Sequence, residues 1–202
     1  MFHLGSLPVA ASFLAATSAL TAARPVLAAT PPTPLRLSAL AVNMSGIGRT
    51  DPQRVEIVLE RWSTDAERAQ LIDTLKKSGS DALLDALQKI TPRAGYIRTT
   101  TSLGWDLQFA RIYDLPKGGY RIVFATDRPM GFYEVRNSAR SSDYEFMFAE
   151  IRVGPDGPGE GKLVAAARIT FDKGEDKIEI ENYGNEPVRL NDVRVELDKK
   201  DK

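Results

Sequence analysis

The stretch over residues 105–124, WDLQFARIYDLPKGGYRIVF, decides the fold. Apolar side chains alternate with polar ones on both sides of residues 116–119, a pattern typical of two antiparallel strands joined by a tight turn. The alternating positions are Trp105, Leu107, Phe109 and Tyr113 before the turn, and Tyr120, Ile122 and Phe124 after it. With a further strand predicted over residues 96–102, these strands form a meander.

The alternation continues downstream of this hairpin. Residues 144–153 carry aromatic side chains on one face and mainly aliphatic ones on the other, so both faces of this strand are expected to be covered. Further strands are predicted over residues 163–171, 178–180, 188–190 and 193–197. A change of parity at Asn191 and Asp192 predicts a bulge or a tight bend between the last two.

Upstream, strands predicted over residues 35–41 and 55–62 precede a pair of helices. Thr64 and Glu67 have the spacing of a capping box, which marks a helix N-terminus. Gly79 can end this first helix, and Pro92 stops the second from continuing. The expected apolar faces are Ala66, Ala69, Ile72 and Leu75 on the first helix, and Leu83, Ala86, Leu87 and Ile90 on the second.

These elements predict a mainly β (α+β) fold, an antiparallel β-barrel or sandwich of about eight strands with one helical hairpin inserted after the second strand. The strands follow one another through short connections, which favours the barrel. The helices are then expected to lie against an open end or against the outer face.

The N-terminus has the pattern of an export signal. Residues 7–23 carry no charge and are rich in Ala and Leu, so residues 1–28 are predicted to be a cleavable signal peptide, with an uncleaved membrane anchor as the alternative. Residues 29–34 form a Pro-rich spacer, residues 35–197 a single domain, and residues 198–202 a charged tail. The expected location is periplasmic or extracellular, with no stable membrane span after processing.

Composition restricts the chemistry. The chain has no Cys, and its single His, His3, lies in the predicted signal peptide. A mature protein without imidazole or thiol cannot form a Ser-His-Asp or Cys-His site, a His- or Cys-based zinc site, or a disulfide. The 27 Lys and Arg residues balance 27 Asp and Glu residues, which argues against nucleic acid as a partner. No cofactor is expected.

Acidic turns offer oxygen atoms that could bind calcium. Asp156 and Glu160 occupy one turn, and Asp172, Glu175 and Asp176 occupy another. Neither has the spacing of an EF-hand loop, and Asp and Gly are ordinary turn residues. We therefore predict no metal site.

Three phrases resemble stretches of exported bacterial proteins that have no assigned activity. They are RWSTDAER at residues 61–68, GYIRT at residues 95–99 and ATDRP at residues 125–129. The resemblance implies a periplasmic or extracellular setting and carries no catalytic residues with it.

Aromatic and Arg side chains between residues 105 and 140 are the candidate ligand-binding groups. Trp105, Arg111 and Tyr113 share one face of the predicted strand, which can line a pocket or form part of the core. Arg side chains near aromatic rings in the following segment can hold an anion or a planar ligand, or can simply solvate a long loop. The predicted ligand-binding residues are Trp105, Arg111, Tyr113, Arg121, Arg128 and Tyr133.

Three functions follow as alternatives. The first is a non-catalytic exported domain that binds a small or amphipathic ligand, or a partner protein of the cell envelope. The second is a hydrolase or isomerase that uses Asp, Glu or Tyr, for example Asp106, Glu134 and Asp143. The third is a structural component of the envelope. Two carboxylates converging in a deep pocket would favour the second function, and a fully packed interior would count against it. A filled barrel with a large apolar outer patch would indicate the third.

Overall fold

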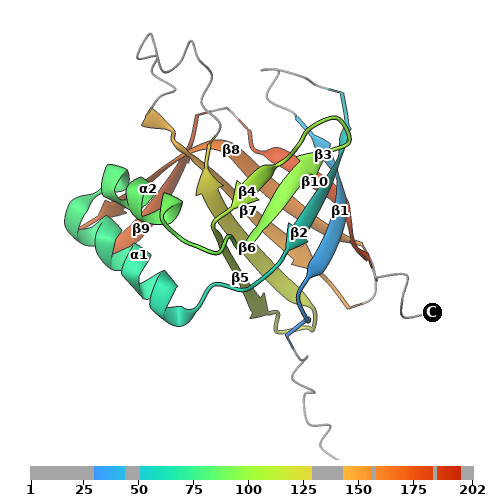
Figure 1. Ribbon diagram of the computed structural model, residues 1–202, viewed down its shortest axis with the longest axis horizontal. Coiled ribbons are helices and arrows are strands. Elements are labelled where there is room, and N and C mark those ends of the chain that lie inside the picture. The colour runs from blue at the N-terminus through green and yellow to red at the C-terminus, as the bar shows by residue number, and fades with distance from the viewer. Residues whose placement is uncertain (1–29, 44–50, 129–142, 156–157, 184–185, 197–202) are drawn as a thin grey trace, which may run out of the picture.

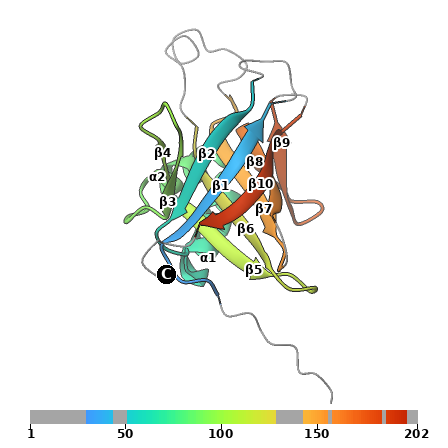
Figure 2. The same ribbon diagram turned by 90° about the vertical axis from the view of Figure 1, so that its right-hand side faces the viewer.

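The computed structural model describes residues 30–43, 51–128, 143–155, 158–183 and 186–196. The predicted signal peptide and charged tail lie outside these residues. Within them the chain forms a ten-stranded antiparallel sheet and a pair of helices (Figures 1 and 2). The elements in order are β1 (Leu35–Val42), β2 (Gln53–Leu59), α1 (Asp65–Ser78), α2 (Ser80–Gln88), β3 (Gly95–Thr99), β4 (Trp105–Leu107), β5 (Phe109–Asp114), β6 (Tyr120–Asp127), β7 (Phe146–Val153), β8 (Gly159–Asp172), β9 (Lys177–Asn182) and β10 (Val188–Glu196).

The sheet curls into a nearly closed barrel. Its strand order is β4-β3-β2-β1-β10-β8-β7-β6-β5, with β9 paired to β8 outside this path. The two ends of the order, β4 and β5, are consecutive in the chain and separated by Gln108 alone. One segment therefore pairs with β3 through its first half and with β6 through its second half, which brings the sheet edges together. The predicted barrel is confirmed.

Side-chain hydrogen bonds stabilise the seam, the place where β4 and β6 meet as the barrel closes. Thr126 of β6 is fully buried, and its hydroxyl donates a 2.7 Å hydrogen bond to the carbonyl oxygen of Asp106 in β4. The indole Nε1 of Trp105 donates to the carbonyl oxygen of Asp127 at 2.8 Å. Buried backbone and hydroxyl groups need hydrogen-bond partners. The three-residue strand β4 forms few backbone hydrogen bonds, so these two side-chain hydrogen bonds help to hold it against β6.

The barrel interior is filled with side chains. Inward-facing residues of nine strands form one core cluster, whose most buried large members are Leu37, Ile57, Leu59, Leu107, Ile122, Phe124, Ile151 and Leu190. Phe124 lies in register between Ala110 and Ala149, so the small neighbours leave room for its ring. Such alternation of large and small residues is how a narrow barrel fills its interior.

The helical hairpin packs on the outside of the barrel. Leu71, Leu75, Leu83 and Leu87 form a second core cluster with Phe146 of β7 and with Ala167 and Ile169 of β8. The start of β7 is thus covered on both faces, as predicted, because Met147 and Ala149 contribute to the interior cluster while Phe146 packs under the helices. The outer face of the second half is open, with Arg152 exposed. Figure 1 shows α1 and α2 beside β9 at this outer face.

Local signals at the helix ends are confirmed. The expected face of α1 is wrong at Ala66 and Ala69, whereas Leu75 is buried and Ile72 is partly buried, as the predicted face requires. The Thr64 hydroxyl accepts from the amide of Glu67, and the Glu67 carboxylate accepts from the amide of Thr64. Ala66 and Ala69 are exposed, whereas Leu71 and Leu75 are buried. An α-helix has 3.6 residues per turn, so residues spaced by three, such as Ala66, Ala69 and Ile72, move gradually around the helix. Leu71 and Leu75 are four residues apart and stay on one face.

None of the described helices is long and apolar enough to cross a membrane.

Two strand boundaries differ from the prediction. Residues 105–113 form two strands, because the chain changes partner at Gln108. Residues 188–196 form the single strand β10, because the parity change at Asp192 is absorbed as a bulge with φ of 51° at that residue. The predicted turn at residues 116–119 is present, and Gly119 is required there because its φ is 84° and a Cβ would lie 2.1 Å from the carbonyl oxygen of Val153.

Candidate functional site

Two hollows lie side by side on the outer face of β7 and β8. One is apolar and measures about 220 Å³, and the other is charged and measures about 660 Å³. Phe148 of β7 and Ile180 of β9 line both of them. The two hollows are therefore neighbouring parts of one trough.

The apolar hollow lies where the helical hairpin, the barrel wall and β9 meet. Its walls are Leu71, Leu75, Leu83 and Leu87 from the helices, Val123 and Phe148 from the sheet, and Ile178 and Ile180 from β9. The strand β8 continues past its pairing with β7 and carries β9 with it. Ile178 and Ile180 consequently stand at the rim, 38% and 41% exposed. An apolar wall that stays partly open to water is a common property of binding grooves.

Arg68 lines the apolar hollow from the first half of α1. It lies on the same helix face as Leu71 and Leu75, three and seven positions before them. Its side chain is exposed and forms no ion pair with another described residue. Arg68 thus adds one cation to an otherwise apolar wall.

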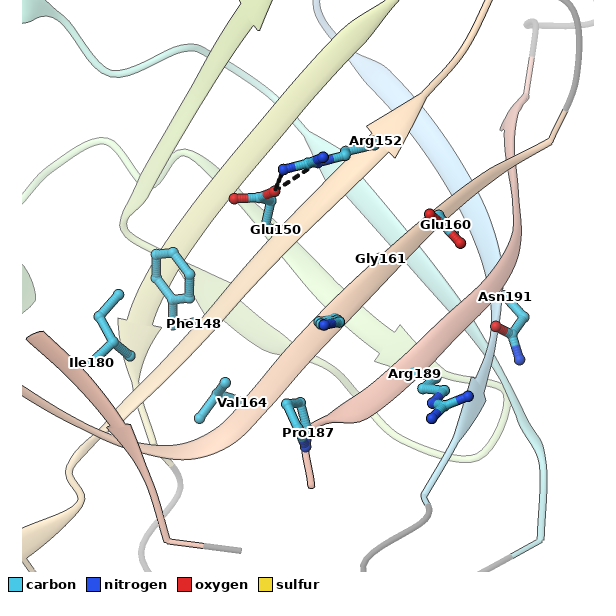
Figure 3. A pocket seen from close by; sticks show the side chains of 11 residues that line it. Phe148, Glu150, Arg152, Glu160, Gly161, Val164, Ile180, Pro187, Arg189 and Asn191 are labelled. Carbon is cyan, nitrogen blue, oxygen red and sulfur yellow. Dashed lines mark hydrogen bonds and ion pairs between the residues drawn. The ribbon is translucent and has the colours of Figure 1, made fainter. Parts of the chain in front are cut away.

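The charged hollow lies on the outer faces of β7, β8 and β10. Figure 3 shows Phe148, Val164 and Ile180 toward one end, and Arg152, Glu160, Arg189 and Asn191 toward the other. Lys162 also lines it, and the strand register places Glu150, Lys162 and Arg189 opposite one another on three adjacent strands. The trough therefore changes along its length from apolar to charged.

Some of the charged side chains that line this hollow form ion pairs with each other or with neighbouring residues. Arg152 contacts the Glu150 carboxylate at 2.8 Å (Figure 3), and Arg121 approaches it at 4.0 Å. Arg189 lies 3.8 Å from Glu186, and both side chains are more than half exposed. Lys162 forms no ion pair among the residues that the structure describes. The long, exposed pair between Arg189 and Glu186 contributes little to stability, so Arg189 and Lys162 remain available to a ligand, whereas the closer contact with Arg152 engages Glu150.

The six residues predicted from the sequence are distributed over several places. Tyr113 lines the apolar hollow, with Arg121 4.6 Å and Arg111 5.8 Å from its ring centroid. Arg111 is paired with Asp65 at 2.7 Å at the start of α1. Arg128 donates from Nε to the carbonyl oxygen of Tyr144 at 2.6 Å, which joins the end of β6 to the segment before β7. Tyr133 lies outside the described residues.

Trp105 does not share a face with Arg111 and Tyr113, contrary to the prediction. Trp105 packs against the interior cluster, whereas Tyr113 lines the outer hollow. The reason is the change of strand partner at Gln108, after which Ala110 and Ile112, rather than the odd-numbered residues, point inward. A one-residue irregularity exchanges the two faces of a strand.

Sequence analysis missed most residues of the trough. Phe148, Ile178 and Ile180 lie in strands that the sequence predicts, without a predicted role in binding. Val164, Lys162, Arg189 and Arg68 are not among the predicted ligand-binding residues. One signal was present in the sequence: Ile178 and Ile180 alternate with Lys177, Glu179 and Glu181 in a strand too short to bury much surface. The position of this strand beside the helices could not be read from the sequence, because it depends on long-range pairing.

Two of the carboxylates considered for acid-base chemistry or calcium binding, Asp106 and Asp172, form contacts of another kind. Asp106 binds Arg93 at 2.6 Å, and the same guanidinium binds Glu60 through two 2.9 Å hydrogen bonds. The hydrogen bonds from Arg93 lower the pKa of Glu60. Asp172 caps its own turn by accepting from the amides of Gly174 and Glu175, which is turn chemistry. Glu134 and Asp156 lie outside the described residues.

Glu145 is held in an unfavourable environment. Burial raises the pKa of its carboxyl, and Asp81, Asp143 and Asp85 raise it further, while Arg128 opposes them. A carboxyl whose pKa is higher in the folded state destabilises the fold at pH values above that pKa and stops doing so below the unfolded value, about 4.3.

Glu145→Gln is therefore expected to raise the free energy of unfolding at neutral pH. The gain should shrink as the pH falls and vanish near about pH 4, where the wild-type carboxyl is protonated in both states. Urea titrations across this range measure it, with the exposed turn variant Glu175→Gln as control. An equal gain in the free energy of unfolding at acidic pH would show that the ionised Glu145 carboxylate is not the cause.

The trough offers apolar and charged contact surfaces for a ligand. Among the described residues, no group of three His, Cys, Asp or Glu side chains is placed to hold a metal ion. Comparisons with protein families, with curated proteins and with solved structures gave no match.

Proposed function

We propose that this protein is a non-catalytic, exported domain that binds a small amphipathic molecule on the outside of its barrel. The apolar part of the ligand lies in the apolar hollow, and its polar part lies in the charged hollow. The observation that carries the proposal is that Phe148 and Ile180 line both hollows, so one molecule can reach from one to the other.

The physical chemistry of the trough supports this choice. Each methylene that a ligand buries between the helices and β9 contributes about 0.8 kcal/mol. In the neighbouring charged hollow, the polar group of the ligand can keep its contacts with water and with side-chain donors. The ligand therefore avoids the free-energy cost of burying that group without hydrogen bonds. Inside the barrel the side chains of the interior cluster occupy the space. The outer trough is thus the better place for a ligand.

Acid-base catalysis has weaker support. Asp106 and Asp143 line neither hollow, and Asp106 is already bound to Arg93. Glu150 lines the charged hollow but its carboxylate is engaged by Arg152. The proposed setting outside the cytoplasm rests on the uncharged apolar segment at residues 7–23.

Decanol, a neutral amphiphile, tests the apolar half of the site. We expect saturable binding by isothermal titration calorimetry below the solubility limit of decanol, with methyl chemical-shift changes at Leu71, Leu75 and Ile180. Ile180→Asp places a charge at the junction of the hollows and should weaken binding by about tenfold or more, since burying an unpaired charge against an alkyl chain costs over 1.4 kcal/mol.

Two control variants isolate the effect. Ile180→Val keeps an apolar side chain and should keep the affinity within about twofold. Leu103→Asp makes a change of the same kind at a fully exposed residue outside both hollows and should leave binding unchanged. Absence of saturable decanol binding, or equal binding by Ile180→Asp and wild type, would contradict the proposed function.

A further inference from the structure

We infer that the polar part of the ligand is an anion, a phosphate or carboxylate group, held between Lys162 of β8 and Arg189 of β10. This inference rests on the proposed function and specifies the headgroup of the amphipathic ligand. It makes the ligand class a single-chain anionic lipid.

The strand register supplies the first argument. Lys162 and Arg189 are direct partners in the antiparallel pairing of β8 with β10, and both line the charged hollow. Like charges directly opposite one another on adjacent strands repel and are unfavourable. An anion between the two side chains would turn this repulsion into attraction.

The neighbouring ion pairs supply the second argument. Glu150 faces Lys162 from β7, but its carboxylate contacts Arg152 at 2.8 Å and lies 4.0 Å from Arg121. Glu186 lies 3.8 Å from Arg189 in an exposed pair, which is weak. The carboxylates nearby therefore leave the Lys162 and Arg189 pair incompletely neutralised.

The remaining groups of the hollow fit an anion at this place. Glu160 is the other carboxylate in the hollow, and the register puts it opposite Arg152 rather than opposite Lys162. The Asn191 side chain lines the hollow from β10 and adds an amide donor. An Arg fork and a Lys ammonium together suit phosphate or carboxylate oxygens.

Arg68 offers a competing position for the headgroup at the apolar hollow. It is a single cation, whereas Lys162 and Arg189 form a pair, and the hollow around that pair has about three times the volume. The opposite orientation, with the headgroup at Arg68, is therefore the alternative that the experiment has to separate.

Titrations with decyl phosphate, decanoate, decanol and decyltrimethylammonium, all below their micelle concentrations, test the headgroup. We expect decyl phosphate and decanoate to bind about tenfold more tightly than decanol, because two exposed charge contacts together contribute about one order of magnitude in affinity. Decyltrimethylammonium should bind most weakly. The advantage of decyl phosphate over decanol should fall as salt is added.

Charge-removing variants locate the anion. The double variant Lys162→Gln/Arg189→Gln should still bind decanol and should bind decyl phosphate no more tightly than decanol. Arg68→Gln and the exposed turn variant Lys117→Gln should both keep the preference for decyl phosphate. Thermal unfolding of each variant confirms that the fold is intact.

The outcomes separate this inference from the proposed function. Equal affinity of wild type for decyl phosphate and decanol, or loss of the preference in Arg68→Gln but not in the double variant, would overturn the anion site and leave the proposed function standing. Binding of phosphatidylglycerol vesicles without binding of any monomeric amphiphile would overturn both, since the surface would then be a membrane contact.

Discussion

Phe124→Ala is expected to lower the free energy of unfolding by about 3–5 kcal/mol. Phe124 is 0% exposed in the middle of β6, and its register partners on both sides are alanines. Neither alanine can expand into the space of the missing ring, so most of the cavity persists and its lining loses packing contacts. Urea unfolding, followed by circular dichroism, measures the change.

The same measurement on Phe171→Ala serves as the control. Phe171 lies at the margin of the outer cluster, partly exposed, with the Lys76 ammonium 4.6 Å from its ring centroid. Phe171→Ala should lower the free energy of unfolding clearly less than Phe124→Ala, because Phe171 buries less apolar surface. A loss below about 1.5 kcal/mol for Phe124→Ala would mean that the barrel interior is loosely packed, contrary to the structure.

Phe146→Ala is expected to lower the free energy of unfolding by a similar amount, about 3–5 kcal/mol, and to loosen the helical hairpin in particular. Phe146 is 0% exposed and contributes to the outer cluster together with the four buried leucines of α1 and α2. Because the hairpin has few other contacts with the barrel, it should open at a lower free energy than the strands.

Amide hydrogen exchange distinguishes this local effect from a global one. Residues 65–88 should lose more protection than β1 and β2, which lie elsewhere on the barrel. The conservative variant Phe146→Leu should cost less than about 1.5 kcal/mol and keep the hairpin protected. An equal loss of protection over all elements would show that the hairpin and the barrel unfold as one unit.

Much of the fold could be predicted because its signals are local. The alternation around residues 116–119, the capping box at Thr64 and the two-faced strand at residues 144–153 each depend on neighbours in the chain. Even the bulge at Asp192 is visible as a change of parity. The barrel followed from these signals because consecutive strands joined by short connections tend to pair.

The exchange of partners at Gln108 was not predictable in the same way. The sequence alternates smoothly enough through residues 105–113 to suggest one strand, and only the pairing with β3 on one side and β6 on the other divides it. Barrel closure is a long-range requirement that leaves no mark on local periodicity. For this reason period-two alternation predicts one face for Trp105 and Tyr113, although the two side chains lie on opposite faces of the sheet.

The trough escaped prediction for the same reason. It joins residues that are up to about 120 positions apart, from Arg68 of α1 to Arg189 of β10. Cation pairs such as Lys162 and Arg189 are unremarkable in sequence and become informative only when the register sets them opposite each other. Of the predicted ligand-binding residues that the structure describes, Tyr113 alone lines either hollow.

An outer binding site is compatible with a filled barrel. The long strand β8 serves the barrel through its pairing with β7 and β10, and then continues to carry β9 beside the helices. The extension creates an apolar wall outside the core, so ligand binding and core packing use different side chains. Variants of the trough rim are thus expected to change affinity with little effect on stability.

The most direct test is to measure intermolecular nuclear Overhauser effects between decyl phosphate and the methyl-labelled protein. The account predicts that one bound molecule gives contacts from its terminal methyl group to Leu71, Leu75 and Leu83, and from its first methylene to Ile180 and Val164, near the charged hollow. Contacts to the interior residues Leu37 or Ile57 instead, or no saturable contacts, would contradict the claim that the outer trough is the binding site.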